Sequence, residues 1–364
     1  MTRPTDVLVL GGGIVGLSTA LAAADRGMLV VVVDERRAGA ASRAAAGLLA
    51  PSLEGLPSSA LAMAITARDG YAAFVAHLVA RTGLPVPLDL GGILEVAATP
   101  AELSGLARRC APPARFLDQV ALASMEPGLA GNVGALLHPG DGAVDSVALM
   151  RALERAVEQE SRIERVTDRV VSIQMGGVSC TADTAGSGRL HARQLVFAPG
   201  AWAGGVPGLP RRLPVRPVRG ELLRLDLAPI RHPTAGHGGY LVPRGGSLVV
   251  GATSEDWGFS AHTSDEGRDA LLAFARRTVP ALERAVVLEH WSGLRPVTPD
   301  GLPLLGRDPD VPSLVYGCGF SRNGILLAPW AAGELAALLS GEARPGLSAF
   351  VSPLRFDGEK DNLQ

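Results

Sequence analysis

The chain of 364 residues carries a formal net charge of −2, with 34 Lys and Arg against 36 Asp and Glu. This balance gives no electrostatic case for binding nucleic acid, and no uninterrupted apolar run approaches the roughly 18 residues of a membrane-spanning helix. The length allows two domains, and a hydrophobic content of 47% indicates a globular chain rather than a disordered one.

A glycine-rich motif stands at the start of the chain. The apolar run 7–10 leads into Gly11-Gly12-Gly13-Ile14-Val15-Gly16, an alanine-rich helix former follows, and a second apolar run ends at Asp34. This order of strand, glycine turn, helix, strand and acid predicts a dinucleotide-binding βαβ unit. We expect Gly11 to form the turn, Gly13 to let backbone approach a pyrophosphate, and Gly16 to bring the helix close to the strand.

The acidic residue narrows the choice of dinucleotide. Asp34 follows the motif at about the 20-residue distance expected of a carboxylate that hydrogen-bonds a ribose hydroxyl. It favours an unphosphorylated ribose, and so FAD or NAD rather than NADP. The motif alone does not separate FAD from NAD, and a purely structural glycine turn is the alternative.

The termini and cysteines bear on the compartment. The first predicted strand begins within six residues of the first residue, so we expect no signal peptide. Cys110, Cys180 and Cys318 are odd in number and lack metal-ligand spacing, so we expect buried thiols in a reducing cytoplasm and no metal site.

Periodicity and capping signals predict the remaining elements. Residues 38–47 are nearly all small, which suits backbone lying against a flat group or, alternatively, a plain helix start with Ser42 as N-cap. Helices are predicted at 58–82, 101–110, 145–160, from the capping box Thr263-x-x-Glu266 to about 279, and 324–339. Strands are predicted at 88–97, 165–175, 188–198, 216–225 (as an edge strand), 240–243 and 247–252 (as a hairpin), and 286–291.

Nucleotide-sheet features stand at both ends of the chain and near its middle, with meander-like strands between them. The expected fold is therefore α/β, with a discontinuous Rossmann-like cofactor domain and an inserted antiparallel-sheet domain. The cofactor domain is assigned to residues 1–85, 140–212 and 291–364, and the substrate domain to 86–139 and 213–290.

Several blocks in this order are similar to one family. They are the opening motif with Asp34, Ser42-Arg43-Ala44-Ala45-Ala46-Gly47, Gly200-Ala201-Trp202, Tyr240-Leu241-Val242-Pro243-Arg244, Gly293-Leu294-Arg295-Pro296 and Arg322-Asn323-Gly324-Ile325. The chain resembles the FAD-dependent amine oxidases of the D-amino-acid oxidase fold over nearly its whole length, and within them the glycine oxidases of the thiamine pathway.

The resemblance implies roles for particular residues. Arg295 would clamp the substrate carboxylate, Tyr240 would assist, and Arg322 would lie near the substrate end of the flavin. A planar carboxylate suits the bidentate fork of Arg better than the point charge of Lys. The surface ion-pair alternative for Arg295 and the core alternative for Tyr240 remain open, as does a phosphate or backbone contact for Arg322.

The resemblance also implies a set of residues around a noncovalent FAD. The set is Gly11, Gly13, Ile14, Val15, Gly16, Asp34, Glu35, Ser42, Arg43, Ala46, Gly47, Leu48, Val171, Gly200, Trp202, Arg295, Gly319, Arg322, Asn323, Gly324 and Ile325. No cysteine lies near Arg295, where relatives that attach the flavin covalently carry one. Ser254 stands where the family member used for comparison has an apolar Met, which puts the preferred side chain in doubt.

These inferences predict an enzyme that oxidises glycine or another small amino acid or N-alkyl glycine, such as sarcosine or D-alanine. Hydride would pass from Cα to the flavin, the imine would hydrolyse to a 2-oxo acid, and dioxygen would become hydrogen peroxide. Three alternatives remain: a dehydrogenase that uses another electron acceptor, a non-catalytic FAD-binding subunit, and an NAD dehydrogenase. We expect a small amino acid and O2 as partners, neither nucleic acid nor membrane, and leave room for a homo-oligomer.

Overall fold

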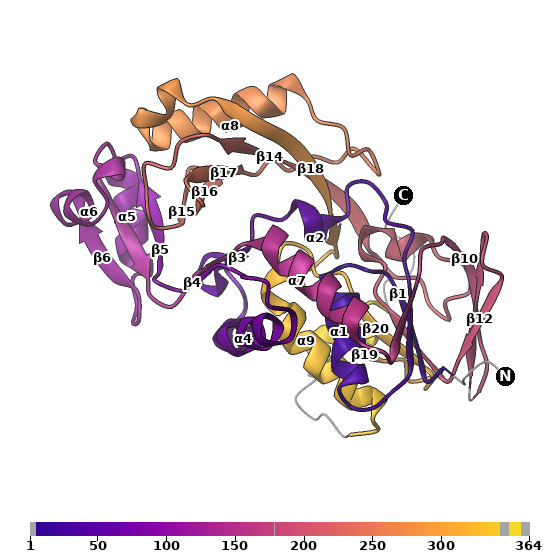
Figure 1. Cartoon of the computed structure of the whole chain (residues 1–364). Helices are drawn as coiled ribbons and strands as arrows, with labels where there is room; N and C mark the ends of the chain where they lie inside the picture. Colours follow the sequence, from indigo (N-terminus) through magenta and orange to yellow (C-terminus); the bar gives the residue numbers. More distant parts are fainter. Residues whose placement is uncertain (1–4, 178, 343–348, 358–364) are drawn as a thin grey trace.

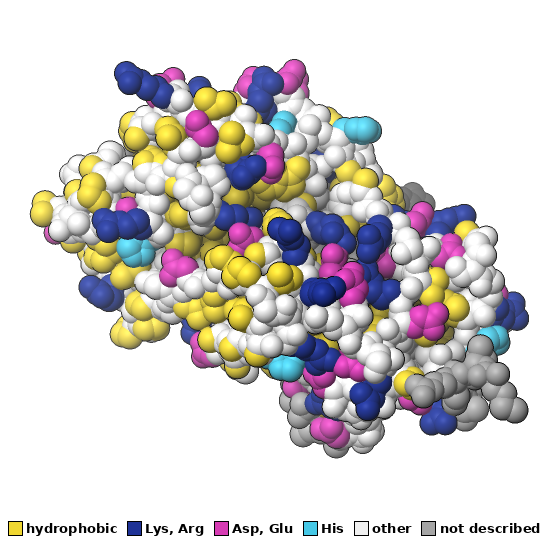
Figure 2. All heavy atoms as spheres, in the orientation of Figure 1, with side chains coloured by type: hydrophobic (Ala, Val, Ile, Leu, Met, Phe, Trp, Pro, Cys, Tyr) yellow, Lys and Arg dark blue, Asp and Glu magenta, His cyan; other side chains and the backbone are white. Residues whose placement is uncertain are grey.

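The computed structural model describes residues 5–177, 179–342 and 349–357. Two large sheets organise this part of the chain, and each sheet carries its own helices (Figure 1). On the face drawn in Figure 2, basic and acidic side chains are interspersed, in keeping with the small net charge. No helix in the described part of the chain combines the length and apolar character needed to cross a bilayer.

The first sheet is parallel apart from one edge strand. Its order is β19-β20-β13-β1-β2-β9, and only the pair β19–β20 is antiparallel. Every residue of β1 and β2 is buried, which explains the uninterrupted Val and Leu runs, because parallel strands are covered on both faces. The strands are β1 (Val7–Leu10), β2 (Val30–Val33), β9 (Ile163–Val166), β13 (Gln194–Phe197), β19 (Leu304–Arg307) and β20 (Leu314–Cys318).

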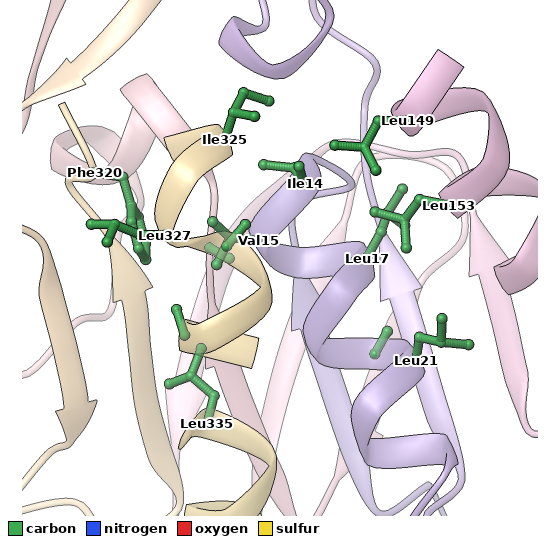
Figure 3. Close-up of a cluster of buried hydrophobic side chains, with 14 of the residues drawn as sticks. Ile14, Val15, Leu17, Leu21, Leu149, Leu153, Phe320, Ile325, Leu327 and Leu335 are labelled. Atoms are coloured by element: carbon green, nitrogen blue, oxygen red, sulfur yellow. The ribbon is translucent and has the colours of Figure 1, made fainter. Parts of the chain in front are cut away.

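Helices cover one face of this sheet and a small antiparallel sheet covers the other. Leu17 and Leu21 of α1 face Leu149 and Leu153 of α7, while the helix α9 packs on the other side of α1 (Figure 3). The helices of this layer are α1 (Ile14–Ala24), α3 (Ser58–Asp69), α4 (Tyr71–Thr82), α7 (Ser146–Gln159) and α9 (Gly324–Leu339). The covering sheet is β10 (Val170–Met175), β11 (Cys180–Thr184) and β12 (Arg189–Ala192).

The second large sheet arches over the first domain (Figure 1). Its order is β18-β14-β17-β16-β15-β5-β7-β6, and only β15 and β5 run parallel. The strands are β5 (Ile93–Ala97), β6 (Arg115–Asp118), β7 (Gly134–His138), β14 (Arg216–Leu225), β15 (Thr234–Gly236), β16 (Gly239–Arg244), β17 (Ser247–Gly251) and β18 (Val287–Val297). Its helices are α5 (Pro100–Arg109), α6 (Gln119–Met125) and α8 (Asp265–Thr278).

The two faces of the second sheet pack against different parts of the molecule. Leu223, Leu241 and Val250 pack with Phe274 of α8 in one core cluster. Because successive residues of a strand point to opposite faces, their neighbours along each strand point toward the first domain. Short elements join the domains there: α2 (Ala41–Ala44) and the sheet of β3 (Leu48–Leu49), β8 (Gly142–Val144) and β4 (Leu88–Asp89). Short 3₁₀ helices lie at Pro51–Leu53, Pro127–Leu129, Gly200–Gly205, Pro280–Arg284, Ala349–Val351 and Pro353–Phe356.

The predicted α/β fold with an antiparallel second sheet is confirmed, and several predicted elements are corrected. The helix predicted at 58–82 is two helices that meet at Gly70. The strand predicted at 88–97 is interrupted at Gly91–Gly92, 165–175 is interrupted between β9 and β10, and 188–198 between β12 and β13. The N-cap of α8 is Ser264, not Thr263, because the Ser264 hydroxyl accepts the Gly267 N–H.

Two further predictions differ near the second sheet. Residues 216–225 were expected at an edge, but β14 lies between β17 and β18. The strand predicted at 286–291 continues to Val297, so the boundary proposed at residue 291 falls inside β18. The division into domains otherwise remains a prediction.

Candidate active site

A large cavity of about 1300 Å³ runs between the first sheet and the facing surface of the second. Its lining includes the turn after β1, the acid after β2, the turn after β13, the loop before α9 and the strands β14, β16 and β18. Carboxyl ends of parallel strands meet at one edge of the sheet, which is where such folds bind nucleotides. The cavity thus joins the glycine motif to the second sheet.

The glycine motif has the shape that its spacing predicts. An added Cβ at Gly16 would lie 1.9 Å from the carbonyl oxygen of Gly11, so only glycine allows this contact between helix and turn. The helix α1 begins at Ile14 with no acidic residue in its first turn and no side chain capping it within the motif. Its positive end therefore faces the cavity, as a pyrophosphate requires.

Ser42 supports this turn from another segment. Its hydroxyl oxygen accepts the backbone N–H of Ile14 at 3.0 Å. It does not cap its own helix, because the N-cap of α2 is Ala40. The small-residue stretch is therefore attached to the first residue of α1 and lines the cavity beside the phosphate-facing turn.

Two side chains of the second domain hold the same stretch from the other side. The indole N–H of Trp291 donates to the Ala44 carbonyl at 2.9 Å, and Arg244 donates to the Ala46 carbonyl at 2.6 Å. Burial lowers the pKa of Arg244, and the Asp145 carboxylate 3.6 Å away partly offsets this effect. These bonds fix a thin backbone wall to which a flat ring could bind.

The second sheet presents one row of side chains to this wall. Strand pairing places Trp291, Leu222, Gly251, Tyr240, Ala235 and Glu95 side by side on neighbouring strands. Arg295 and Gly220 lie on the same face, since they stand an even number of residues from Trp291 and Leu222. Tyr240 packs against Gly251, where an added Cβ would lie 2.5 Å from the phenol ring.

Arg295 is held by backbone rather than by a carboxylate. Its Nη1 donates to the Thr253 carbonyl at 3.1 Å and to the Arg219 carbonyl at 3.3 Å. Burial lowers the pKa of Arg295, while the nearby Tyr240 opposes that change. Burial raises the pKa of the Tyr240 hydroxyl, so it remains a neutral donor beside the guanidinium. A cation and a hydroxyl donor held this way suit a carboxylate ligand.

Arg322 reaches the same cavity from the loop before α9. Its Nε lies 3.6 Å from an oxygen of Glu54, and its side chain is 66% exposed. Its charge acts on both Arg295 and Tyr240. The backbone N–H of Ser321 donates to the Pro296 carbonyl at 2.8 Å, which ties this loop to the end of β18.

A buried network of charged side chains lies next to Arg295. Arg219 is fully buried, with Nη2 2.7 Å from Glu221 and Nε 3.2 Å from Glu255. Its guanidinium carbon lies 3.5 Å from the ring centroid of Trp257. Burial alone would raise the pKa of Glu221, but the hydrogen bonds from Ser264 and His290 and the charge of Arg219 together outweigh it, and the pKa is lowered. The network fixes the Arg219 carbonyl that Arg295 uses.

The cavity brings together most of the residues chosen from the sequence. Nineteen positions of the predicted cofactor set line it, as does Tyr240: Gly11, Gly13, Ile14, Val15, Asp34, Glu35, Ser42, Ala46, Gly47, Leu48, Val171, Gly200, Trp202, Arg295, Gly319, Arg322, Asn323, Gly324 and Ile325. Two positions of the set are not in its lining. Gly16 lies beneath the turn, and Arg43 forms an ion pair with Glu154 on α7.

The cavity also contains residues that sequence reasoning missed. Glu54, Arg37, Glu95 and Phe259 all line it. They lie outside the motifs whose spacing identified the other lining residues. No three His, Cys, Asp or Glu side chains in the described ranges are grouped as a metal site requires.

A dinucleotide fold whose cavity also contains a buried guanidinium and a tyrosine hydroxyl is typical of a dinucleotide-dependent enzyme that acts on a small acid. The family model "FAD dependent oxidoreductase" matches residues 6–338. The chain belongs to this family of FAD-dependent oxidoreductases, and FAD is its cofactor. The residues present fit the group: the start of α1 would hold the phosphates, Asp34 would bind a ribose hydroxyl, and the backbone wall fixed by Trp291 would lie against the ring.

Individual relatives are similar over nearly the whole chain. It is 35% identical over 346 residues to a glycine oxidase of Geobacillus kaustophilus, which covers 90% of this chain and 91% of the relative. A crystal structure of glycine oxidase from that organism has a TM-score of 0.90 at 32% identity, covering 97% of this chain and 99% of the other. The chain is 36% identical to the bifunctional protein ThiO/ThiG of a Nostoc species, covering 93% of this chain but only 53% of the relative. It spans about half the length of such bifunctional relatives.

Proposed function

We propose that the protein oxidises glycine or another small amino acid or N-alkyl glycine at Cα. One observation carries the proposal: Arg295 and Tyr240 lie on one face of the second sheet, in the cavity that also contains the dinucleotide motif. The glycine oxidase relatives support the same substrate class.

Arg295 binds the substrate carboxylate through its guanidinium, and Tyr240 donates one hydrogen bond to it. Because its pKa is raised, the Tyr240 hydroxyl keeps its proton across the neutral pH range. Both groups are fixed before substrate arrives, so the substrate Cα is oriented without further ordering of the clamp. No protein base is needed for a substrate that enters with its amine neutral.

When bound, FAD would supply the two-electron acceptor for the hydride that leaves Cα, and its reoxidation by dioxygen would give hydrogen peroxide. As Cα loses its hydride, the amine lone pair forms the C=N bond of an imine, and the amine proton leaves to solvent. Water then hydrolyses the imine to a 2-oxo acid and ammonia or an amine. For glycine the products are glyoxylate, ammonia and hydrogen peroxide.

The first turn of α9 contributes to the same chemistry. The helix begins at Gly324 with no acidic residue in its first turn, and the buried Tyr71 hydroxyl donates to the Ile325 carbonyl at 2.8 Å. The positive end of α9 therefore has a fixed position at the cavity. There it stabilises negative charge that develops when the cofactor is reduced.

The test is anaerobic mixing of the holoprotein with glycine, sarcosine and D-alanine while the flavin absorbance is recorded. Bleaching with at least one is expected, and Arg295→Ala should slow bleaching by a factor on the order of 100 or more, because it removes a desolvated charge pair. Absence of bleaching with all three refutes the proposal. Bleaching without peroxide in air would assign a dehydrogenase instead.

The pathway, the compartment and the oligomeric state are also part of the proposal. We infer a role in thiamine synthesis from the resemblance to the glycine oxidases of that pathway, and a reducing cytoplasm from the three free cysteines. A homo-oligomer is compatible with it, and a measured molar mass in solution would determine that state.

A further inference from the structure

The segment between β17 and α8 leaves the second sheet and reaches the first domain. The Ser292 hydroxyl donates to the Ala261 carbonyl at 2.6 Å, which fixes the segment to β18. An added Cβ at Gly39 would lie 2.7 Å from the Cβ of Ala261, so the loop after β2 is in close contact with it. The two domains meet here beside the cavity.

An aromatic pair spans this junction. The rings of Trp202 and Phe259 are stacked, with centroids 6.1 Å apart and planes 17° from parallel. The guanidinium of Arg37 lies 5.1 Å from the Trp202 ring centroid, and its Nε is 2.6 Å from Glu35. All four side chains belong to residues that line the cavity.

The pair connects the two ends of the cavity. Trp202 belongs to the turn after β13, whose Pro199 lies against Gly11 of the glycine motif. Phe259 belongs to the segment fixed to β18, the strand of Arg295. The stacked rings therefore cross the cavity wall between the phosphate-facing turn and the carboxylate clamp.

The exposure of Phe259 is unusual for a position held so firmly. Its side chain is 54% exposed, yet it lines a cavity and stacks on a residue of the other domain. A large apolar ring at the rim of a site contributes most to the binding free energy when a ligand covers the part of its surface that is still exposed. A cofactor with two aromatic ring systems is such a ligand.

We propose that Arg37, Trp202 and Phe259 form a further part of the FAD site, a retaining wall built by both domains. The wall slows FAD release, because the cofactor leaves only after the contact between Trp202 and Phe259 opens. FAD affinity then depends on a residue of the second domain that makes no contact with the glycine motif. The inference rests on the cofactor alone and not on the proposed substrate.

The test measures FAD release from the holoprotein without any turnover. Release into excess buffer is followed by the rise in flavin fluorescence, and the Kd is obtained by titrating the apoprotein with FAD. Phe259→Ala should raise both the rate of FAD release and the Kd for FAD by about tenfold, because it removes an aromatic stack and the apolar area that the ring covers. Phe259→Tyr keeps the stack and should stay within about twofold of the unmodified protein.

Phe116→Ala is the matched control, since Phe116 is a 44% exposed phenylalanine on β6 that does not line the cavity. It should leave FAD release unchanged. Equal release rates for Phe259→Ala and Phe116→Ala would overturn the proposal, as would a Phe259→Tyr variant as defective as Phe259→Ala. Thermal unfolding of the apoproteins separates a loss of folding from a loss of retention.

Discussion

Gly220 is the position where a single methyl group tests the carboxylate clamp. An ideal Cβ there would lie 2.3 and 2.4 Å from the two terminal nitrogens of Arg295 and 2.5 Å from its central carbon. Ordinary contacts are longer than 3.4 Å, so in Gly220→Ala the guanidinium must retreat by roughly 1 Å. That movement takes it away from the Thr253 and Arg219 carbonyls that hold it.

The effect should appear in binding rather than in folding. The group that must move is the far end of a flexible side chain, and replacing glycine at a compatible backbone position stabilises a protein by about 0.4–1 kcal/mol. A charged hydrogen bond that is misplaced loses about 1.5–3 kcal/mol, which corresponds to roughly 10- to 150-fold in affinity. We therefore expect a folded holoprotein that binds carboxylates weakly.

The assay is titration with acetate or glycolate, carboxylates without an amine, followed by the change in flavin absorbance. Gly220→Ala should raise their Kd roughly 10- to 150-fold, with an unchanged Kd for FAD. Gly333→Ala in α9 is the control, because an added Cβ there has no neighbour within 4 Å. Unaltered carboxylate binding by a well-folded Gly220→Ala protein would refute the placement of Arg295 in the clamp.

Three further predictions address the groups around the cavity. Ser42→Ala removes the acceptor of the Ile14 N–H and should lower the free energy of unfolding of the apoprotein by about 1 kcal/mol in urea, a result that an unchanged midpoint would contradict. The pKa of Glu221 in the folded protein lies below the unfolded value of 4.5. The stability that the Glu221 carboxylate provides is therefore complete above pH 4.5 and is lost as the pH falls through the folded pKa. In thermal melts recorded against pH, Glu221→Gln should weaken this loss of stability at acid pH. Glu54→Gln removes a negative charge near Tyr240 and Arg322, so acetate should bind several-fold more tightly at low salt and the gain should shrink at high salt. The Tm should change little, because the partner of Glu54, Arg322, is mostly exposed. An acetate affinity that does not depend on salt would argue against this prediction.

Local spacing was enough to predict the dinucleotide unit. The glycine turn, α1 and Asp34 follow one another within one βαβ unit, and each needs only its neighbours to take shape. The same is true of the helix predicted at 101–110, which is α5, where Thr99 and Glu102 form a capping box at its start. Sequence reasoning fails where the role of a residue depends on a contact with a distant segment, as for Ser42, whose hydroxyl accepts the N–H of Ile14.

The error at β14 has a specific physical cause. Four of its ten residues are charged, Arg216, Arg219, Glu221 and Arg224, and so many charges are more typical of a strand with solvent beside it. Here Arg219 and Glu221 are both fully buried because they neutralise each other 2.7 Å apart at the N-terminal end of α8. Buried charges need partners, and the partner of each is visible only when the fold is known.

The position of Arg295 depends on how the edge of the second sheet is completed. β18 is the outermost strand, and an outermost strand has N–H and C=O groups with no neighbouring strand to bind. The first domain supplies the missing partners on both sides of the arginine. The Leu294 N–H donates to the Gly39 carbonyl at 2.8 Å, and the Pro296 carbonyl accepts the Ser321 N–H at 2.8 Å.

Arg295 thus lies on a backbone segment that both domains hold at adjacent residues. A change that separates the domains would break these two bonds before it disturbs the core of either sheet, since the contacts are at the rim. The clamp and the cofactor loops would then lose their alignment together. The proposed orientation of substrate by Arg295 and the proposed retention of FAD by Phe259 therefore depend on one junction, even though the two residues come from different segments of the chain.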